Sequence, residues 1–164
     1  MKTTKPSEMQ TQIITNAELL EHWQGHRRLT RKLIEIFPEK EFFDYSIGGM
    51  RTASQLIEEL LSIAVPGLRQ IATGNMEEQI HHIDFKEDKN LVLKLWDDTT
   101  NDINEYWSQI SDERFREEIM TFGQYPGTVW SSILYFIDNE IHHRGQAFVY
   151  LRALNIEPPF FWER

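Results

Sequence analysis

Cysteine is absent from this chain of 164 residues, which excludes disulfides, thiolate metal ligands and a cysteine nucleophile. Basic side chains are few: 17 Lys and Arg stand against 26 Asp and Glu, for a formal net charge of −9. Nucleic acids and anionic membranes bind to basic surfaces, so neither is an expected partner. Long apolar runs are also missing, since none approaches the ~18 residues of a membrane-spanning helix. We therefore expect a soluble, cytoplasmic protein.

The chain has one basic run, Arg27, Arg28, Arg31 and Lys32. Its spacing is more typical of a solvated helix face than of an anion site. Residues 1–13 are polar, lack the apolar segment of a signal peptide and are expected to be loose. Residues 14–164 are expected to form a single domain, long enough to bury a core without disulfides.

Four segments carry apolar side chains at helical spacing. Thr15 with Glu18 and Thr52 with Gln55 form capping-box patterns before the first two of them. No alternating strand pattern competes, and Tyr125–Gly127 is expected to be a turn into the last helix. The predicted fold is an all-α, antiparallel four-helix bundle, with a polar crossover after the second helix. The expected helices lie near residues 16–36, 52–74, 88–108 and 128–154.

The most informative segment is Ile137–Leu154, in which one helix face is polar but uncharged. That face carries Asn139, His143, Gln146 and Tyr150. A surface helix would carry Lys, Glu or Arg there, so the row suits a lined cavity better than bulk water. The off-row residues are expected to be structural: Glu140 and Arg144 as ion-pair partners, His142 exposed, and Gly145 where another helix backbone approaches.

Helical projection adds side chains from the first two helices. Glu59 lies on the edge of the apolar face of its helix, whereas Glu58 projects away. His22 and His26 are four residues apart on the apolar face of the first helix, close enough to share a metal or a polar partner. If these two helices are antiparallel neighbours, His26 comes level with Glu59. The alternatives are a boundary glutamate in water and two core histidines with hydrogen-bond partners.

The segment EIHHRGQAFVYLRAL resembles the last helix of the DinB-like superfamily of small bacterial metal-binding bundles, whose mark is HxxxHRGQ followed by an aliphatic YLR stretch. GMRTASQLIEEL resembles that family's second-helix entry, and NIEPPFFWER resembles its proline-containing tail. The resemblance covers nearly the whole chain, and it implies the four-helix fold predicted above.

The resemblance also implies a divalent-metal site. The family's three histidines fall at His143, at Glu59 and at Asn139, so that only one histidine is kept. His143 and Glu59 would hold the ion, His26 would complete the shell, and Asn139 would offer a weak oxygen ligand or hold a water. Neutral imidazole suits zinc, nickel or iron, and nothing in the sequence selects among them. Gln146, Tyr150 and His22 would line the cavity.

Two hypotheses of function follow. The first is a metal-dependent enzyme, a transferase linked to a low-molecular-weight thiol or a hydrolase-type enzyme, because members of the superfamily with known activity include thiol-cofactor-dependent transferases and an isomerase. The second is a non-catalytic bundle that binds a small molecule or acts as a stress-associated dimer without metal. The sequence discloses no substrate. A homodimer is expected because the tail carries Phe160, Phe161 and Trp162, although the four helices already have enough apolar residues to form the core. The alternative is a tail folded back over its own bundle.

Overall fold

The structure, a computed structural model, describes residues 13–164, so the expectation for residues 1–13 lies outside it except at Ile13. Four long helices dominate the chain, joined by one short helix, one turn of 3-10 helix and a small hairpin. The elements are α1 (Asn16–Ile36), α2 (Glu39–Asp44), α3 (Ala53–Thr73), α4 (Lys89–Trp107), η1 (Glu113–Arg116), β1 (Glu118–Thr121), β2 (Tyr125–Thr128) and α5 (Val129–Ala153). The predicted helical bundle is confirmed.

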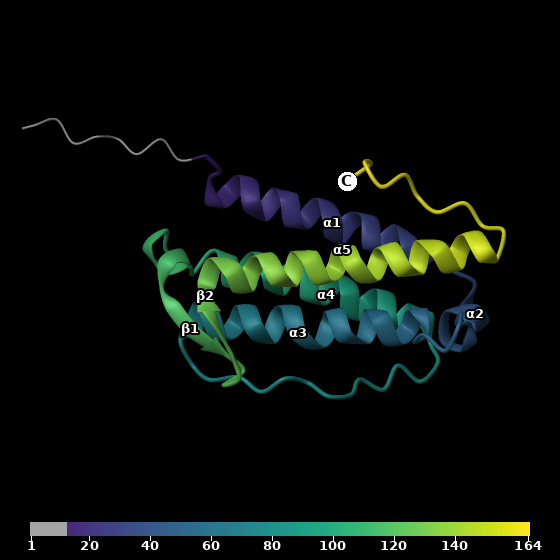
Figure 1. Cartoon of the computed structure of the whole chain (residues 1–164), viewed down its shortest axis with the longest axis horizontal. Helices are drawn as coiled ribbons and strands as arrows, with labels where there is room; N and C mark the ends of the chain where they lie inside the picture. Colours follow the sequence, from purple (N-terminus) through teal and green to yellow (C-terminus); the bar gives the residue numbers. More distant parts are fainter. Residues whose placement is uncertain (1–12) are drawn as a thin grey trace, which may run out of the picture.

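The four long helices form a bundle in which α1 and α3 occupy opposite corners. Each of these two helices packs against both α4 and α5 rather than side by side with the other. Figure 1 shows the crossover between α3 and α4 running along the length of the bundle, so α3 and α4 point the same way. The assumption that the first two long helices are direct neighbours is therefore wrong, and this decides the surroundings of His26.

The helix ends follow the local signals in the sequence. The Thr15 hydroxyl accepts from the Glu18 backbone N–H while the Glu18 carboxylate accepts from the Thr15 N–H, which is a complete capping box. The same arrangement at Thr52 starts α3. Asn155 has a φ of 60°, the left-handed conformation in which glycine often follows a helix. These caps satisfy backbone groups that would otherwise have no partner.

Side chains of all four long helices fill the core, where Trp23 and Trp96 have no exposed surface. Gly67 permits close packing between α3 and α5, because a Cβ there would lie 2.4 Å from the ring of Phe136. The corresponding expectation for Gly145 is wrong: no neighbouring atom lies within 4 Å of a Cβ built at that position. The glycine that permits close packing thus belongs to α3 rather than to α5.

The segment expected to turn into the last helix is instead part of an antiparallel hairpin, in which Thr121 pairs with Tyr125. The turn lies earlier, where Phe122 and Gly123 both have positive φ, as type I′ hairpin turns require. Pro126 is tolerated in β2 because a two-stranded sheet has only edge strands. The hairpin covers one end of the bundle (Figure 1).

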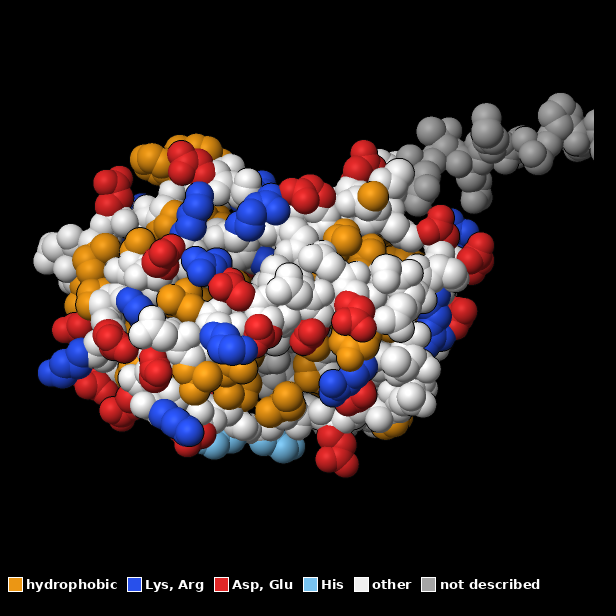
Figure 2. Space-filling model, turned by 180° about the vertical axis from the view of Figure 1, so that it is seen from behind, with side chains coloured by type: hydrophobic (Ala, Val, Ile, Leu, Met, Phe, Trp, Pro, Cys, Tyr) orange, Lys and Arg blue, Asp and Glu red, His pale blue; other side chains and the backbone are white. Residues whose placement is uncertain are grey.

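The basic run of α1 is only partly a solvated face. Arg28 pairs with Glu21 and Arg31 with Asp97 at the surface. Arg27, however, is buried: its guanidinium lies 3.4 Å from the centre of the Trp96 ring and donates to the Trp96 carbonyl. On the face seen in Figure 2, Lys and Arg are interspersed with Asp and Glu. None of the helices within residues 13–164 has the length and apolar character needed to cross a bilayer.

Candidate functional site

Glu59 and His143 meet between α3 and α5. Nε2 of His143 lies 3.0 Å from Oε1 of Glu59, although 84 residues separate them in the chain. The imidazole is buried, and the carboxylate is about one-quarter exposed. The expected proximity of these two side chains is confirmed, because both projected onto the inner faces of helices that do pack together. Their role as metal ligands stays a prediction.

Arg51, which precedes the cap of α3, completes this group. Its guanidinium donates from Nη1 to Oε2 of Glu59, and its Nη2 lies 3.4 Å from Nε2 of His143. The Tyr150 hydroxyl donates to the Arg51 carbonyl at 2.8 Å and fixes the backbone from which the arginine extends. We call Arg51, Glu59 and His143 the open triad. Sequence reasoning missed Arg51 because a loop residue has no helical period to place it.

Hydrogen bonds hold the imidazole of His143 at both nitrogens. Its Nδ1 lies 2.8 Å from the side-chain amide of Gln146, one turn along α5. The atom of Gln146 that faces the ring is Oε1, which only accepts, so Nδ1–H donates to it, while Nε2 lies against Oε1 of Glu59. Gln146 therefore orients His143 rather than lining a cavity, and Tyr150 is buried beneath Arg51.

The carboxyl group of Glu59 is held in its ionised form. Partial burial raises its pKa, but the hydrogen bonds from His143 and Arg51 lower it by more, so the pKa lies below the ordinary value. Each carboxylate oxygen already accepts from one of these partners. Glu59 is thus a fixed negative charge rather than a proton carrier near neutral pH.

The histidines of α1 lie elsewhere, because α1 is diagonal to α3. The expectation that His26 faces Glu59 is wrong: Arg144 donates to its Nδ1 at 2.8 Å, and His22 lies 3.3 Å from its Nε2. Arg164, at the end of the tail, also reaches Nε2 at 3.1 Å. The alternative of a core histidine with hydrogen-bond partners describes His26, whereas His22 is exposed.

A second, buried group surrounds Arg144, as expected for an ion-pair residue. Arg144 lies 3.8 Å from the carboxylate of Glu140. Arg144 also donates to the hydroxyl of Thr30, which in turn donates to Glu140. We call Arg144, Glu140 and His26 the closed triad. Burial raises the pKa of Glu140, although Arg27, Thr30 and Arg144 oppose the shift. Among the described residues, no buried side-chain nitrogen or oxygen lacks a hydrogen-bond partner.

The remaining predicted side chains are dispersed. Asn139 lies one turn before His143 beside Leu60 and Ile63, and no hydrogen bond from its side chain is found within residues 13–164. His142 is exposed, as expected. Glu58, expected to project away, instead accepts from His82 Nδ1 and from the Ile83 backbone N–H, and so anchors the crossover to α3. That contact fixes His82 of the crossover against α3.

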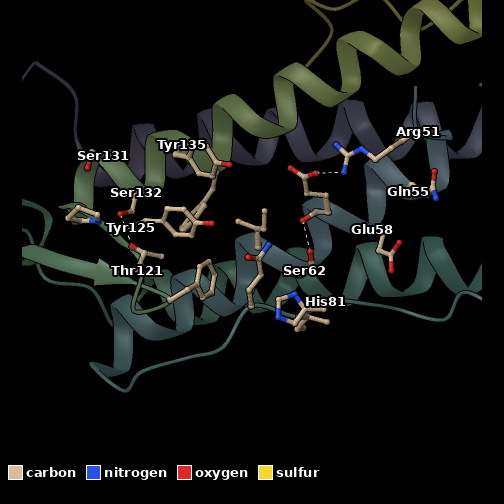
Figure 3. A pocket seen from close by; sticks show the side chains of 17 residues that line it. Arg51, Gln55, Glu58, Ser62, His81, Thr121, Tyr125, Ser131, Ser132 and Tyr135 are labelled. Carbon is tan, nitrogen blue, oxygen red and sulfur yellow. Dashed lines mark hydrogen bonds and ion pairs between the residues drawn. The ribbon is translucent and has the colours of Figure 1, made fainter. Parts of the chain in front are cut away.

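A cleft of about 660 Å³ opens between α3, the crossover, the hairpin and α5. Figure 3 shows Arg51, which pairs with Glu59, at one end of it and Tyr125 and Tyr135 at the other. Apolar and hydroxyl side chains both line its walls, a combination typical of sites for small organic molecules. The lining residues between the ends include Ile63, Phe122, Phe136, Ser62, Thr121, Ser131 and Ser132. His143, Gln146, Tyr150 and His22 do not line this cleft.

The donor set beside the cleft does not fit a divalent metal ion. Within residues 13–164 no three His, Cys, Asp or Glu side chains converge in a way that could hold one. Glu59 and His143 supply two donors, one fewer than the three protein ligands of an open catalytic zinc site. The guanidinium of Arg51 contacts both of them and would repel a second cation.

Comparison with known proteins agrees with the fold. An uncharacterized protein of Bacillus subtilis (strain 168), YjoA, is 25% identical over 151 residues, which are 90% of this chain and 96% of YjoA. A DinB-like protein from Bacillus cereus ATCC 10987 superposes with a TM-score of 0.73 at 16% identity, over 89% of this chain and 97% of its own. The crystal structure of YjoA superposes with a TM-score of 0.68 at 21% identity, over 89% and 99%.

A mycothiol-dependent maleylpyruvate isomerase superposes with a TM-score of 0.61 at 16% identity, over 81% of this chain and 61% of the isomerase. At such identities the likeness to solved structures shows the fold alone. The model of the DinB family matches residues 9–163, which is nearly the full length. The chain thus belongs to the DinB family.

Proposed function

We propose that this protein binds a small organic molecule in the cleft, and that Arg51 takes the place which the family resemblance gives to a metal ion. One observation carries the proposal: the guanidinium contacts Glu59 and His143 at the edge of the cleft. A guanidinium supplies a permanent positive charge and several N–H donors, so it offsets the carboxylate without a metal.

The open triad would form the polar end of the binding site. Arg51 is about half exposed, so N–H groups not used by Glu59 can donate to a ligand. Tyr125 and Tyr135 supply aromatic surface and hydroxyls at the far end. A fixed polar end and an apolar remainder orient a ligand without requiring proton transfer. Such an arrangement supports recognition, and the ionised Glu59 makes acid–base catalysis the less favoured use of the site.

The metal-dependent hypotheses carry less weight. A thiol-linked transferase or a hydrolase-type enzyme would need an ion that polarises a thiol or a water. Two donors and a neighbouring guanidinium do not provide its site. The likeness to the mycothiol-dependent isomerase supports a shared fold and is too distant to carry its thiol over to this chain.

Metal titration of the tag-free protein tests the proposal. We expect zinc and nickel to leave the melting temperature of the wild type unchanged, and purified protein to contain far less than one metal ion per chain. Saturable binding of either ion that is lost in both Glu59→Ala and His143→Ala, but kept in His142→Ala, would contradict it. Combining Arg51→Ala with Asn139→His should create the missing third donor and give measurable zinc binding.

We also propose the homodimer, for which the exposed aromatic tail is the supporting feature. The tail folds back far enough to bring Arg164 to His26, yet Phe161 and Trp162 stay mostly exposed. Exposed aromatic side chains of this size are typical of protein interfaces. Light scattering at micromolar concentration should give twice the mass of the chain. A monomer mass at that concentration would contradict the proposed dimer.

A further inference from the structure

The two ends of the cleft differ in chemistry, and this difference limits the ligands it can take. Phe122, Tyr125, Tyr135 and Phe136 form an aromatic end beside the hairpin. The opposite end lies along α3 and contains the charged residues, as the positions of Arg51 and Glu58 in Figure 3 show. A ligand that fills both ends must therefore combine an apolar or aromatic body with a polar head.

The charge of the lining indicates the sign of that head. Arg51 contributes +1 and the two glutamates, Glu58 and Glu59, contribute −2, so the formal charge of the cleft is −1 with neutral histidine. The chain as a whole carries −9. Both charges raise the local concentration of cations and lower that of anions. An anionic head at Arg51 would also approach the ionised carboxylate of Glu59.

Glu58 provides the acceptor for a cationic head. Its Oε1 accepts from His82 Nδ1 at 2.8 Å and from the Ile83 N–H at 2.7 Å. Its Oε2 has no hydrogen-bond partner within residues 13–164, and the side chain keeps about one-fifth of its surface exposed. Since both oxygens of Glu59 already have partners, Glu58 is the carboxylate with an oxygen to spare.

The hydroxyls of the cleft wall are largely committed to the protein. Ser131 and Ser132 donate to the Thr128 carbonyl, and Ser62 donates to the Glu59 carbonyl. Besides the hydroxyls of Tyr125 and Tyr135, the aromatic end offers ring faces, which attract cations as well as apolar groups. An ammonium group and an aromatic or alkyl body both find complementary surroundings in this cleft.

We propose that the ligand is a small organic amine, with its ammonium group at Glu58 and its body against the aromatic end. This inference rests on the proposed function, because it assumes that the cleft is the binding site. It adds the chemical class, which neither the fold nor the open triad specifies.

Three probes with the same indole body and different heads test the class: tryptamine is a cation, tryptophol is neutral and indole-3-acetate is an anion. Isothermal titration at neutral pH should give the tightest binding for tryptamine, about tenfold over tryptophol, as one charge-assisted hydrogen bond would supply. Indole-3-acetate should bind more weakly than tryptophol. Equal affinity for tryptamine and tryptophol, or a preference for the acid, would overturn the amine class and leave the cleft intact as a site. Failure of all three to bind would contradict the proposed site itself.

Matched variants locate the charge that matters. Glu58→Gln keeps an Oε1 acceptor for the crossover and removes the negative charge, so the tenfold preference for tryptamine over tryptophol should vanish while tryptophol binding is kept. Glu78→Gln removes the same charge from an exposed crossover residue outside the cleft and should leave the preference unchanged. A preference that survives Glu58→Gln, or falls equally in both variants, would show that Glu58 does not hold the amine.

Discussion

Two groups, each made of an arginine, a glutamate and a histidine, lie on opposite sides of α5, and they differ in how far they are buried. Towards α1 stands the closed triad of Arg144, Glu140 and His26, and towards α3 stands the open triad of Arg51, Glu59 and His143. In the closed pair the side chains of Arg144 and Glu140 are 6% and 3% exposed. In the open pair the corresponding fractions are 49% and 24%. Composition alone therefore does not distinguish the structural group from the candidate site.

The pKa values of the two carboxyl groups are shifted in opposite directions, although burial raises both. Loss of hydration outweighs the partners of Glu140, so its pKa is raised. The partners of Glu59 outweigh its partial burial, so its pKa is lowered. A charge that retains some hydration can be held ionised at little cost, whereas a fully buried one depends on every partner it has. The closed triad, whose members need one another, therefore stabilises the packing of the bundle. The open triad keeps exposed surface that a ligand can contact.

Removing one arginine from each triad should give the largest effect. Arg144→Met removes one of the two cations that act on the buried Glu140 and leaves only Arg27, and such losses cost about 3–5 kcal/mol. Arg51→Met breaks a partly exposed pair, for which we expect about 1 kcal/mol or less. Urea denaturation followed by circular dichroism would measure both changes in the free energy of unfolding. Equal losses in the two variants would contradict the distinction between the triads.

The open triad could be predicted in part because helical projection reports which side chains share a face. It placed Glu59 and His143 correctly, since α3 and α5 are neighbours and both residues lie within regular helices. It could not place Arg51, which lies before the cap of α3. It also misplaced His26, because projection gives the direction of a side chain on its own helix and not which helix stands opposite.

Other errors share a physical cause. The spacing of the basic run predicts a solvated face for Arg27, yet contacts with Trp96 and Thr100 on α4 make its burial tolerable. The sequence does not predict the hairpin because β1 and β2 are four residues each, too short to show alternation against the surrounding loops. Both depend on partners distant in the chain, and a single sequence does not record such pairings.

Truncating the histidine of the open triad should have an intermediate effect and sharpen the comparison. His143→Ala removes partners from Glu59 and Gln146 and leaves a buried space, so we expect a loss of about 1–3 kcal/mol in the free energy of unfolding. The neighbouring His142 is exposed, and His142→Ala should change that free energy by less than about 0.5 kcal/mol. The pair controls for the effect of an alanine on helix propensity. A loss at His142 as large as that at His143 would mean that the open triad contributes nothing specific.

The smallest effect concerns the pH dependence of the closed triad. Burial lowers the pKa of His26 to about 3, and the charges of Arg144, His22 and Arg164 act in the same direction. The unfolded chain, with a histidine pKa of about 6.5, therefore binds more protons than the folded protein below neutral pH, and stability falls as the pH falls. Between about pH 7 and about pH 5.5 this amounts to about 1 kcal/mol.

Glu140 opposes this trend, because a raised pKa means that the folded state takes up protons first as the pH falls. Its contribution is separated by comparing the wild type with His26→Asn, which keeps an oxygen acceptor for Arg144 but cannot titrate. Urea midpoints measured across the same pH range should fall less in the variant than in the wild type. If the urea midpoints of both proteins fell equally, His26 would not be held neutral by its burial and its contact with Arg144. That result would contradict the role given to burial in the closed triad.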